Sequence, residues 1–420
     1  MSPRPPPHPM PAQKPLHGAP HSPLHTSRKA ALPQHAIVVG GGLVGKAAAL
    51  ALSQSGLRVA LLAPQAAPLP ADQPFDQRVY ALSASSQALF ERLRVWQALD
   101  PERLGPVSDM RVLGDGTGAL HFSAFQAAVP QLAHIVESLQ VENALDAALR
   151  FQPQLTWLNA RAQGLQIDPV RSDKPALLTL DDGRTLEAEL IVGADGAHSW
   201  VRAQIGASVE RRDYAQTGVV ANFRISLPHA ETAWQWFRDG EIIALLPMAG
   251  PYVSLVWSAE TDHAQRLVAQ GGDVLAAELE RLAGATHGTF ECVTSPVGFP
   301  LALQRVDKLI APRVALVGDA AHLIHPLAGQ GVNLGLRDVA ALTDVLREKE
   351  TFRDLGDRVL LRRYERARRE DIASLTLATD GLHRLFALPG TVAQGLRNVG
   401  MSLVSAQPFV KRWLVEHALG

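Results

Sequence analysis

The stretch AIVVGGGLVGKAAALALSQSGLRVALLAP, which starts at Ala36, most constrains what this chain can fold into. Residues 36–39 form an uninterrupted apolar run of the kind found in buried strands, and residues 57–62, apolar except for Arg58, predict a second strand. The Ala-rich residues between them predict a helix through Ser55 that ends at Gly56. A strand, a helix and a second strand in this order make a βαβ unit, so the sequence predicts an α/β fold with parallel strands.

The turn after the first of these strands carries glycines spaced as G-x-G-x-x-G, at Gly40, Gly42 and Gly45. Gly40 permits the tight turn, Gly42 lets the backbone approach a pyrophosphate, and Gly45 lets the helix pack closely on the strand. The pattern predicts a dinucleotide site without distinguishing a nicotinamide dinucleotide from a flavin dinucleotide. The second strand leads to Ala63, where such units normally have an acid that binds the adenosine ribose, and the nearest polar side chain is Gln65.

Two more strand-like runs lead into short polar turns further along the chain. Residues 190–192 lead to Asp195 and Gly196, and residues 314–317 lead to Asp319. An Asp-Gly pair alone is typical of an ordinary turn. A turn directly after a buried strand, however, lies where open α/β sheets bind their ligands. We therefore expect Asp319 to accept hydrogen bonds from sugar-like hydroxyl groups.

A glycine-rich loop follows Pro326 and leads into a helix that is predicted to begin near Val332. The free N–H groups and the positive dipole end of this helix would face whatever lies above Gly329 and Gly331. A reduced flavin is an anion, so a helix terminus directed at it would stabilise the reduced state.

His322 and His325 are close enough in sequence to suggest a metal pair or a proton relay. Pro326 disfavours a helical conformation at His325, and no carboxylate cluster completes a set of ligands. We therefore expect no metal, and we interpret both histidines as supports of the neighbouring loop.

The composition limits the partners of the chain. The 40 Lys and Arg residues nearly balance the 41 Asp and Glu residues, so the net charge of -1 does not predict a nucleic-acid partner. Cys292 is the single cysteine, which excludes an intrachain disulfide and suits a reducing cytoplasm. Residues 1–34 are rich in Pro and His and predict a disordered tail rather than a signal peptide. The sequence has no stretch of about 18 apolar residues, so any membrane contact is expected to be peripheral.

Taken together, the three strand-to-turn motifs resemble those of the flavin monooxygenases of the p-hydroxybenzoate hydroxylase type. HPLAGQGVNLGLRD, residues 325–338, resembles the signature of the ring hydroxylases of ubiquinone biosynthesis. The likeness includes FDQRVYALSASSQALFERLRVWQAL, which starts at Phe75, and covers nearly everything after the N-terminal tail. It implies an α/β fold made of a Rossmann-like FAD-binding domain, a substrate domain with a mixed or antiparallel sheet, and C-terminal helices.

The resemblance also implies a set of cofactor contacts. The residues expected to bind FAD are Gly40, Gly42, Gly45, Arg78, Asp195, Gly196 and Asp319, and those expected beside the isoalloxazine ring are Gly329, Gln330, Gly331, Val332 and Asn333. Ala63 departs from the family, which usually has glutamate at this place. No catalytic acid or base is expected, because the cofactor supplies the chemistry.

By resemblance, NAD(P)H reduces FAD, dioxygen adds at flavin C4a, and the hydroperoxide hydroxylates the phenolic ring of a polyprenylated ubiquinone precursor. Two alternatives remain, namely hydroxylation of a soluble aromatic acid and a non-catalytic flavoprotein that scaffolds a biosynthetic complex. Trp234-Gln235-Trp236 also invites comparison with flavin halogenases, but Phe237-Arg238 stands where those enzymes continue with Ile-Pro. Two packed aromatic rings are an adequate interpretation of this pair.

These motifs predict a discontinuous domain organisation. The FAD-binding domain is expected to comprise residues 35–105, 131–205 and 301–345, the substrate domain residues 106–130 and 206–300, and a helical C-terminal region residues 346–420. The final residues predict an amphipathic helix with Phe409, Val410, Trp413 and Leu414 on one side and with Lys411 and Arg412 as basic residues. Such a helix suits a cytoplasmic protein that attaches peripherally to the inner face of the membrane or to a ubiquinone-biosynthesis complex.

Overall fold

The computed structural model describes residues 34–64, 75–114, 118–168, 174–238, 240–324 and 330–387, with side chains described as far as Gly381. The N-terminal tail through Pro33, the loop residues His325 and Gly329, and the final amphipathic segment lie outside the described residues. The described residues belong to one compact unit.

The first sheet contains the predicted βαβ unit. Its main path has the order β18 (Ile310–Ala311), β19 (Val314–Leu316), β11 (Thr185–Gly193), β1 (Gln34–Val39), β2 (Val59–Leu62) and β8 (Leu155–Leu158). From β19 to β8 all neighbours are parallel. Two further strands, β10 (Ala176–Leu180) and β9 (Ala162–Gln166), extend the sheet from β11 in antiparallel fashion.

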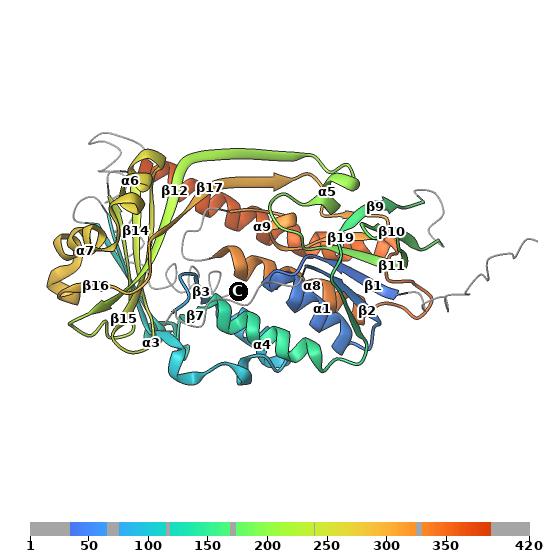
Figure 1. The fold of residues 1–420 in the computed structure, drawn as a ribbon, viewed down its shortest axis with the longest axis horizontal. Helices are drawn as coiled ribbons and strands as arrows, with labels where there is room; N and C mark the ends of the chain where they lie inside the picture. The colour runs from blue at the N-terminus through green and yellow to red at the C-terminus, as the bar shows by residue number, and fades with distance from the viewer. Residues whose placement is uncertain are drawn as a thin grey trace, which may run out of the picture. The chain divides into compact units, whose positions relative to one another are not determined.

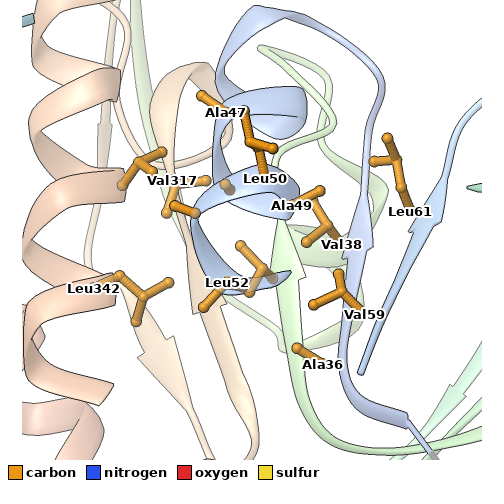
Figure 2. Close-up of a cluster of buried hydrophobic side chains, with 14 of the residues drawn as sticks. Ala36, Val38, Ala47, Ala49, Leu50, Leu52, Val59, Leu61, Val317 and Leu342 are labelled. Carbon is orange, nitrogen blue, oxygen red and sulfur yellow. The ribbon is translucent and has the colours of Figure 1, made fainter. Parts of the chain in front are cut away.

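This sheet is buried because its strands are apolar on both faces. The helix α1 (Leu43–Gln54) lies over β1 and β2, and Figure 2 shows Leu50 and Ala49 of α1 beside Val38 of β1. The helix α8 (Gln330–Arg347) brings Leu342 to the same cluster. Alanine side chains let α1 come close to the strands, so the turn that precedes α1 is held rigidly over the sheet.

The second sheet is mixed, as the sequence predicts. Its path has the order β16 (Phe290–Cys292), β12 (Val209–Ile225), β15 (Tyr252–Glu260), β14 (Glu241–Pro247), β13 (Thr232–Arg238), β5 (Asp109–Leu113) and β6 (Ala119–Ser123), and β17 (Val297–Val306) also pairs with β12. Only the β13–β5 pair among these is parallel. Two helices, α6 (Thr261–Gln270) and α7 (Gly272–His287), cover one face, as Figure 1 shows.

The side chains of Trp234 and Trp236 lie on the helix-covered face of this second sheet. Their rings stack with centroids 5.6 Å apart and planes at 11°, and Trp236 belongs to the same buried cluster as Leu275 of α7. The edge of the His287 ring packs on Trp234. The pair therefore serves core packing, and the comparison with halogenases gains no support.

A third, smaller sheet with the order β3 (Val79–Leu82), β7 (Ala133–Glu137) and β4 (Gly105–Val107) lies between the two large sheets (Figure 1). It packs on the face of the second sheet that α6 and α7 leave free, where Ile135 meets Ala233 and Met248. The remaining helices are α2 (Ala84–Arg92), α3 (Ala124–Ala127), α4 (Ser138–Arg150), α5 (Trp200–Gln204) and α9 (Arg358–Ala387), with short 3-10 turns at Trp96–Ala98, Pro101–Arg103 and Gly318–Ala320.

Several predicted boundaries were wrong by a few residues. The first strand begins at Gln34, and the second begins at Val59, because the Leu57 N–H still closes α1 on Leu52 O at 3.3 Å. The helix α8 begins at Gln330 rather than near Val332.

The C-terminal region is not continuously helical, since the non-helical residues 348–357 separate α8 from α9. The strand β17 crosses the expected domain boundary at residues 300 and 301, because it pairs with β12 along its whole length. The domain division itself stays a prediction.

Candidate cofactor and active site

Three strand ends meet at one edge of the first sheet. The strands β1, β11 and β19 are parallel neighbours in which Val39 pairs with Gly193, and Gly193 with Leu316. The Ala194 N–H donates to Val39 O at 2.8 Å, and the Val317 N–H donates to Gly193 O at 2.9 Å. The turns that carry the predicted glycines, Asp195 and Asp319 therefore lie side by side.

Two of the three fingerprint glycines are required by close packing within the protein. Gly40 has a φ of +122°, and a Cβ atom there would lie 2.2 Å from Ala194 O. A Cβ atom at Gly45 would lie 2.1 Å from Gly40 O. These contacts press the turn and α1 onto the strand ends, as the fingerprint predicts.

Gly42 differs from its neighbours, because a Cβ atom there would meet nothing within 4 Å. Gly42 is the N-cap of α1, supplies no side-chain acceptor, and precedes a first turn without acidic residues. The N–H groups at this helix end point out of the turn with the positive end of the dipole. Open space above a glycine at a helix N-terminus fits a pyrophosphate group.

The N-terminus of α8 offers a second open position. A Cβ atom at Gly331 would also meet nothing within 4 Å. The buried Gln330 side chain accepts a hydrogen bond from Arg337 Nη2 at 3.4 Å, whereas Val332 packs against the main core. The first turn of α8 has no acidic residue. This helix end therefore suits a group that carries negative charge.

Asp319 lies in the 3-10 turn that follows β19, and its side chain is exposed although the residues on either side of it are buried. The surrounding protein desolvates the carboxyl group and raises its pKa above the ordinary value, while the charges of His322 and Arg78 oppose this rise. Gln304 Nε2 donates to Asp319 O at 3.2 Å and fixes the turn from β17. An accessible carboxylate in desolvating surroundings is suited to bind hydroxyl groups of a ligand.

Arg78 reaches the same region from the start of β3. Its guanidinium carbon lies 5.1 Å from the centroid of the Phe299 ring on β17, and its side chain is exposed. Its main chain is held by the Ser138 N–H, which donates to Arg78 O at 2.9 Å. Arg78 and Asp319 are far apart in the sequence, but in the structure Arg78 is close enough to affect the pKa of Asp319.

Asp195 has a role within the protein as well as its expected place in the site. Its Oδ2 accepts the Val201 N–H at 3.0 Å, and its Oδ1 accepts the hydroxyl of Ser199, the N-cap residue, so it supports the start of α5. Gly196 follows with a φ of +82° and open space around the position of a Cβ atom. A ligand would share this carboxylate with α5.

The structure restricts the expected role of Asn333. This side chain is fully buried, and its Oδ1 accepts the Ser83 N–H at 3.0 Å and the Ser86 hydroxyl at 2.7 Å. Its Nδ2 donates to Ala81 O at 2.8 Å. Asn333 therefore fastens α8 to the β3–α2 segment, and any contact with a cofactor would involve its main chain.

The described residues that follow β2, Ala63 and Pro64, supply no acid for a ribose, and Gln65 lies outside the described residues. Ala63 is fully buried, and Trp157 Nε1 donates to its carbonyl oxygen at 3.3 Å. The Nζ atom of the buried Lys46 lies 6.0 Å from the centroid of the Trp157 ring, and it is 2.8 Å from Asp146 Oδ1 and 3.3 Å from Glu142 Oε2. Lys46 and its two partners on α4 were missed by the motif analysis.

His322 is a structural support, as expected, but its main partner was not anticipated. Its Nε2 lies 2.6 Å from Asp338 Oδ2, and both side chains are buried. Asp338 in turn accepts from Arg368 Nε at 2.7 Å. One signal was available in the sequence, because Asp338 occupies the apolar face of α8 between Leu334 and Leu342, where an acid requires a buried partner.

Comparison with known proteins identifies the family. Residues 34–379 match the FAD binding domain family. The chain is 34% identical over 389 residues to ubiquinone hydroxylase UbiL of Rhodospirillum rubrum, covering 91% of this chain and 89% of the relative. It is 33% identical over 390 residues to 3-demethoxyubiquinol 3-hydroxylase of Escherichia coli, covering 92% of this chain and 99% of the relative.

Solved structures show the same fold at low identity. The p-nitrophenol 4-monooxygenase PnpA of Pseudomonas putida superposes with a TM-score of 0.74 at 19% identity, covering 92% of this chain and 98% of the other. HpxO of Klebsiella pneumoniae, solved with FAD and uric acid, gives 0.71 at 18% identity, covering 91% and 96%. Within the described residues, no helix is both long and apolar enough to cross a bilayer. By its sequence matches, the chain belongs to the FAD-dependent hydroxylases of ubiquinone biosynthesis, a family of flavin monooxygenases.

Proposed function

We propose that this protein hydroxylates the phenolic ring of a polyprenylated ubiquinone precursor, using FAD, NAD(P)H and dioxygen. The observation that carries the proposal is the meeting of three parallel strand ends, with the open Gly42 at one of them and the accessible Asp319 at another. The names of the relatives in Rhodospirillum rubrum and Escherichia coli support the substrate class.

In this proposal the cofactor is held by groups from all three turns. The N-terminus of α1 at Gly42 would bind the pyrophosphate, and Arg78 would add positive charge. Asp319 would accept hydrogen bonds from the ribityl hydroxyl groups, with Asp195 and Gly196 beside it. The N-terminus of α8 would face the isoalloxazine ring.

Bound FAD supplies hydride acceptance and the activation of dioxygen, and the protein supplies orientation and exclusion of water. The first sheet with α1 and α8 would bind the cofactor, and the second sheet would bind the substrate. No side-chain acid or base is assigned to the reaction.

The second sheet offers an apolar surface for a lipid-like ring substrate. Val220, Val256 and Ala244 lie in register across β12, β15 and β14, and each is partly exposed. They share the face on which Leu246 packs with Val79 of β3, next to Arg78. Small apolar side chains provide a surface suited to an aromatic, lipid-like ring.

The test is to delete the gene in its native host and to identify the quinone lipids by mass spectrometry. We expect a prenylated precursor that lacks a ring hydroxyl group to accumulate, and a plasmid copy of the gene to remove it. A plasmid copy with Asp319→Ala should fail to do so. Unchanged ubiquinone and no new precursor in the deletion strain would refute the proposal. If the deletion strain lost ubiquinone and the plasmid copy with Asp319→Ala restored it, a scaffolding role would be favoured.

A further inference from the structure

A buried carboxylate lies directly behind the turn that presents Asp319. Asp338 on α8 is fully buried, and its two oxygens receive three donors. The Gly318 N–H donates to Oδ2 at 2.9 Å, and His322 Nε2 lies 2.6 Å from the same oxygen. Since Gly318 and His322 flank Asp319 in the chain, one carboxylate holds the turn at both ends.

The other oxygen of Asp338 is held from outside the turn. Arg368 on α9 is 5% exposed, and its Nε donates to Asp338 Oδ1 at 2.7 Å. Arg368 Nη1 donates to Asp371 at 2.6 Å, and Nη2 donates to Leu334 O at 3.4 Å. All the nitrogen atoms of this guanidinium therefore have partners, and its orientation is fixed.

The neighbours of Asp338 keep its carboxyl group ionised. Burial alone would raise the pKa of Asp338, but His322 and Arg368 outweigh it and hold the pKa below its ordinary value. Asp338 is thus ionised at neutral pH. An ionised carboxylate is a stronger acceptor than a neutral group for the Gly318 N–H.

We propose that Asp338 and Arg368 are positioning residues for the cofactor, which act through Asp319. Arg368 orients the Asp338 carboxylate, which fixes Gly318 and His322 so that the Asp319 side chain points out of the turn. Neither Asp338 nor Arg368 is accessible, so neither touches a ligand itself. This inference rests on the proposed function, because it takes FAD as the ligand of Asp319.

The decisive variant removes both charges together, as Asp338→Asn with Arg368→Met. A single Asp338→Asn change would take from the buried Arg368 its buried carboxylate partner and would endanger folding. The double variant removes the cation and the anion together. We therefore expect its apoprotein to regain most of the melting temperature that the single change loses. The dissociation constant for FAD, measured by titrating FAD into apoprotein, should nevertheless stay at least about tenfold above the wild-type value.

A positioning role predicts coupling that a purely structural role does not. In an Asp319→Ala background, the double change should weaken FAD binding by less than about threefold, because the residue through which it acts is gone. The proposal is overturned if the double change raises the dissociation constant for FAD by the same factor with and without Asp319. It is also overturned if the double variant is as stable as expected and binds FAD with wild-type affinity. Wild-type protein that binds no FAD would instead refute the proposed function.

A conservative change and a control on the same helix complete the design, and Arg368→Lys, which keeps Asp338 paired with a cation, is the variant least at risk of misfolding. Arg368→Lys keeps a cation beside Asp338, and its FAD dissociation constant should stay within about threefold of wild type, whereas Arg368→Met should raise it about tenfold. Arg369→Met is the matched control, since Arg369 is the next residue on α9, lies exposed and pairs with Glu365. Equal FAD affinities for Arg368→Met and Arg369→Met would contradict the proposal.

Discussion

Asp319→Ala is expected to weaken FAD binding at least about tenfold, because charge-assisted hydrogen bonds contribute roughly 1.5–3 kcal/mol each. The same change should leave the melting temperature of the apoprotein at pH 7 unchanged or higher. Desolvation by the surrounding protein raises the pKa of Asp319 in the folded state, so this group stabilises the fold at acid pH and that contribution is lost as the pH rises through the folded pKa. Asp319→Ala removes this group, so the melting temperature of the variant apoprotein should fall less than that of the wild type as the pH rises.

The measurements for Asp319→Ala are a titration of apoprotein with FAD and a thermal melt of the apoprotein. Asp344→Ala is the control, since Asp344 lies further along α8, is partly exposed and pairs with Arg347. Wild-type FAD affinity in Asp319→Ala would show that the turn serves packing alone.

The alanine variants of Gly40 and Gly42 are expected to fail in different ways. Gly40→Ala places a Cβ atom 2.2 Å from Ala194 O at a φ of +122°, so it should destabilise the apoprotein by about 3 kcal/mol or more. Gly42→Ala adds a methyl group where nothing lies within 4 Å, at a φ of -73°, so the apoprotein should fold normally. The same methyl group would occupy the approach of the pyrophosphate and weaken FAD binding more than about tenfold.

Soluble yield, the melting temperature of the apoprotein and FAD titration separate these two outcomes. Wild-type FAD affinity in Gly42→Ala would contradict a pyrophosphate site at the N-terminus of α1. A wild-type melting temperature in Gly40→Ala would contradict the close contact between Gly40 and Ala194 O.

Local patterns in the sequence were sufficient to predict that three strand ends and their turns meet at one edge of the first sheet. The spacing of Gly40, Gly42 and Gly45 and the apolar runs that precede Asp195 and Asp319 are local signals, and parallel strands place their carboxyl ends together. The boundaries at Gln34 and Gln330 were less well defined, because helix and strand ends depend on neighbouring hydrogen bonds.

The supporting contacts could not be predicted from local patterns. Asp338 and Arg368 are far apart in the chain and meet only because α9 packs on α8, so their pairing is a tertiary property. Asn333 has the residue type of a ligand contact, but the fold turns its amide toward Ala81. The ion pairs of Lys46 could not be predicted either, because its acidic partners lie on α4, far from Lys46 in the sequence.

The central claim is that this protein inserts one atom of dioxygen into the ring of a prenylated phenol with FAD as cofactor. The most direct test incubates the purified protein with FAD, NAD(P)H, a prenylated phenol and isotopically labelled dioxygen, and follows the product by mass spectrometry. The expected product has one additional oxygen atom that carries the label, and Asp319→Ala should form much less of it when FAD is kept near the wild-type dissociation constant. Oxygen that comes from water, or NAD(P)H oxidation without a hydroxylated product from any prenylated phenol supplied, would contradict the central claim.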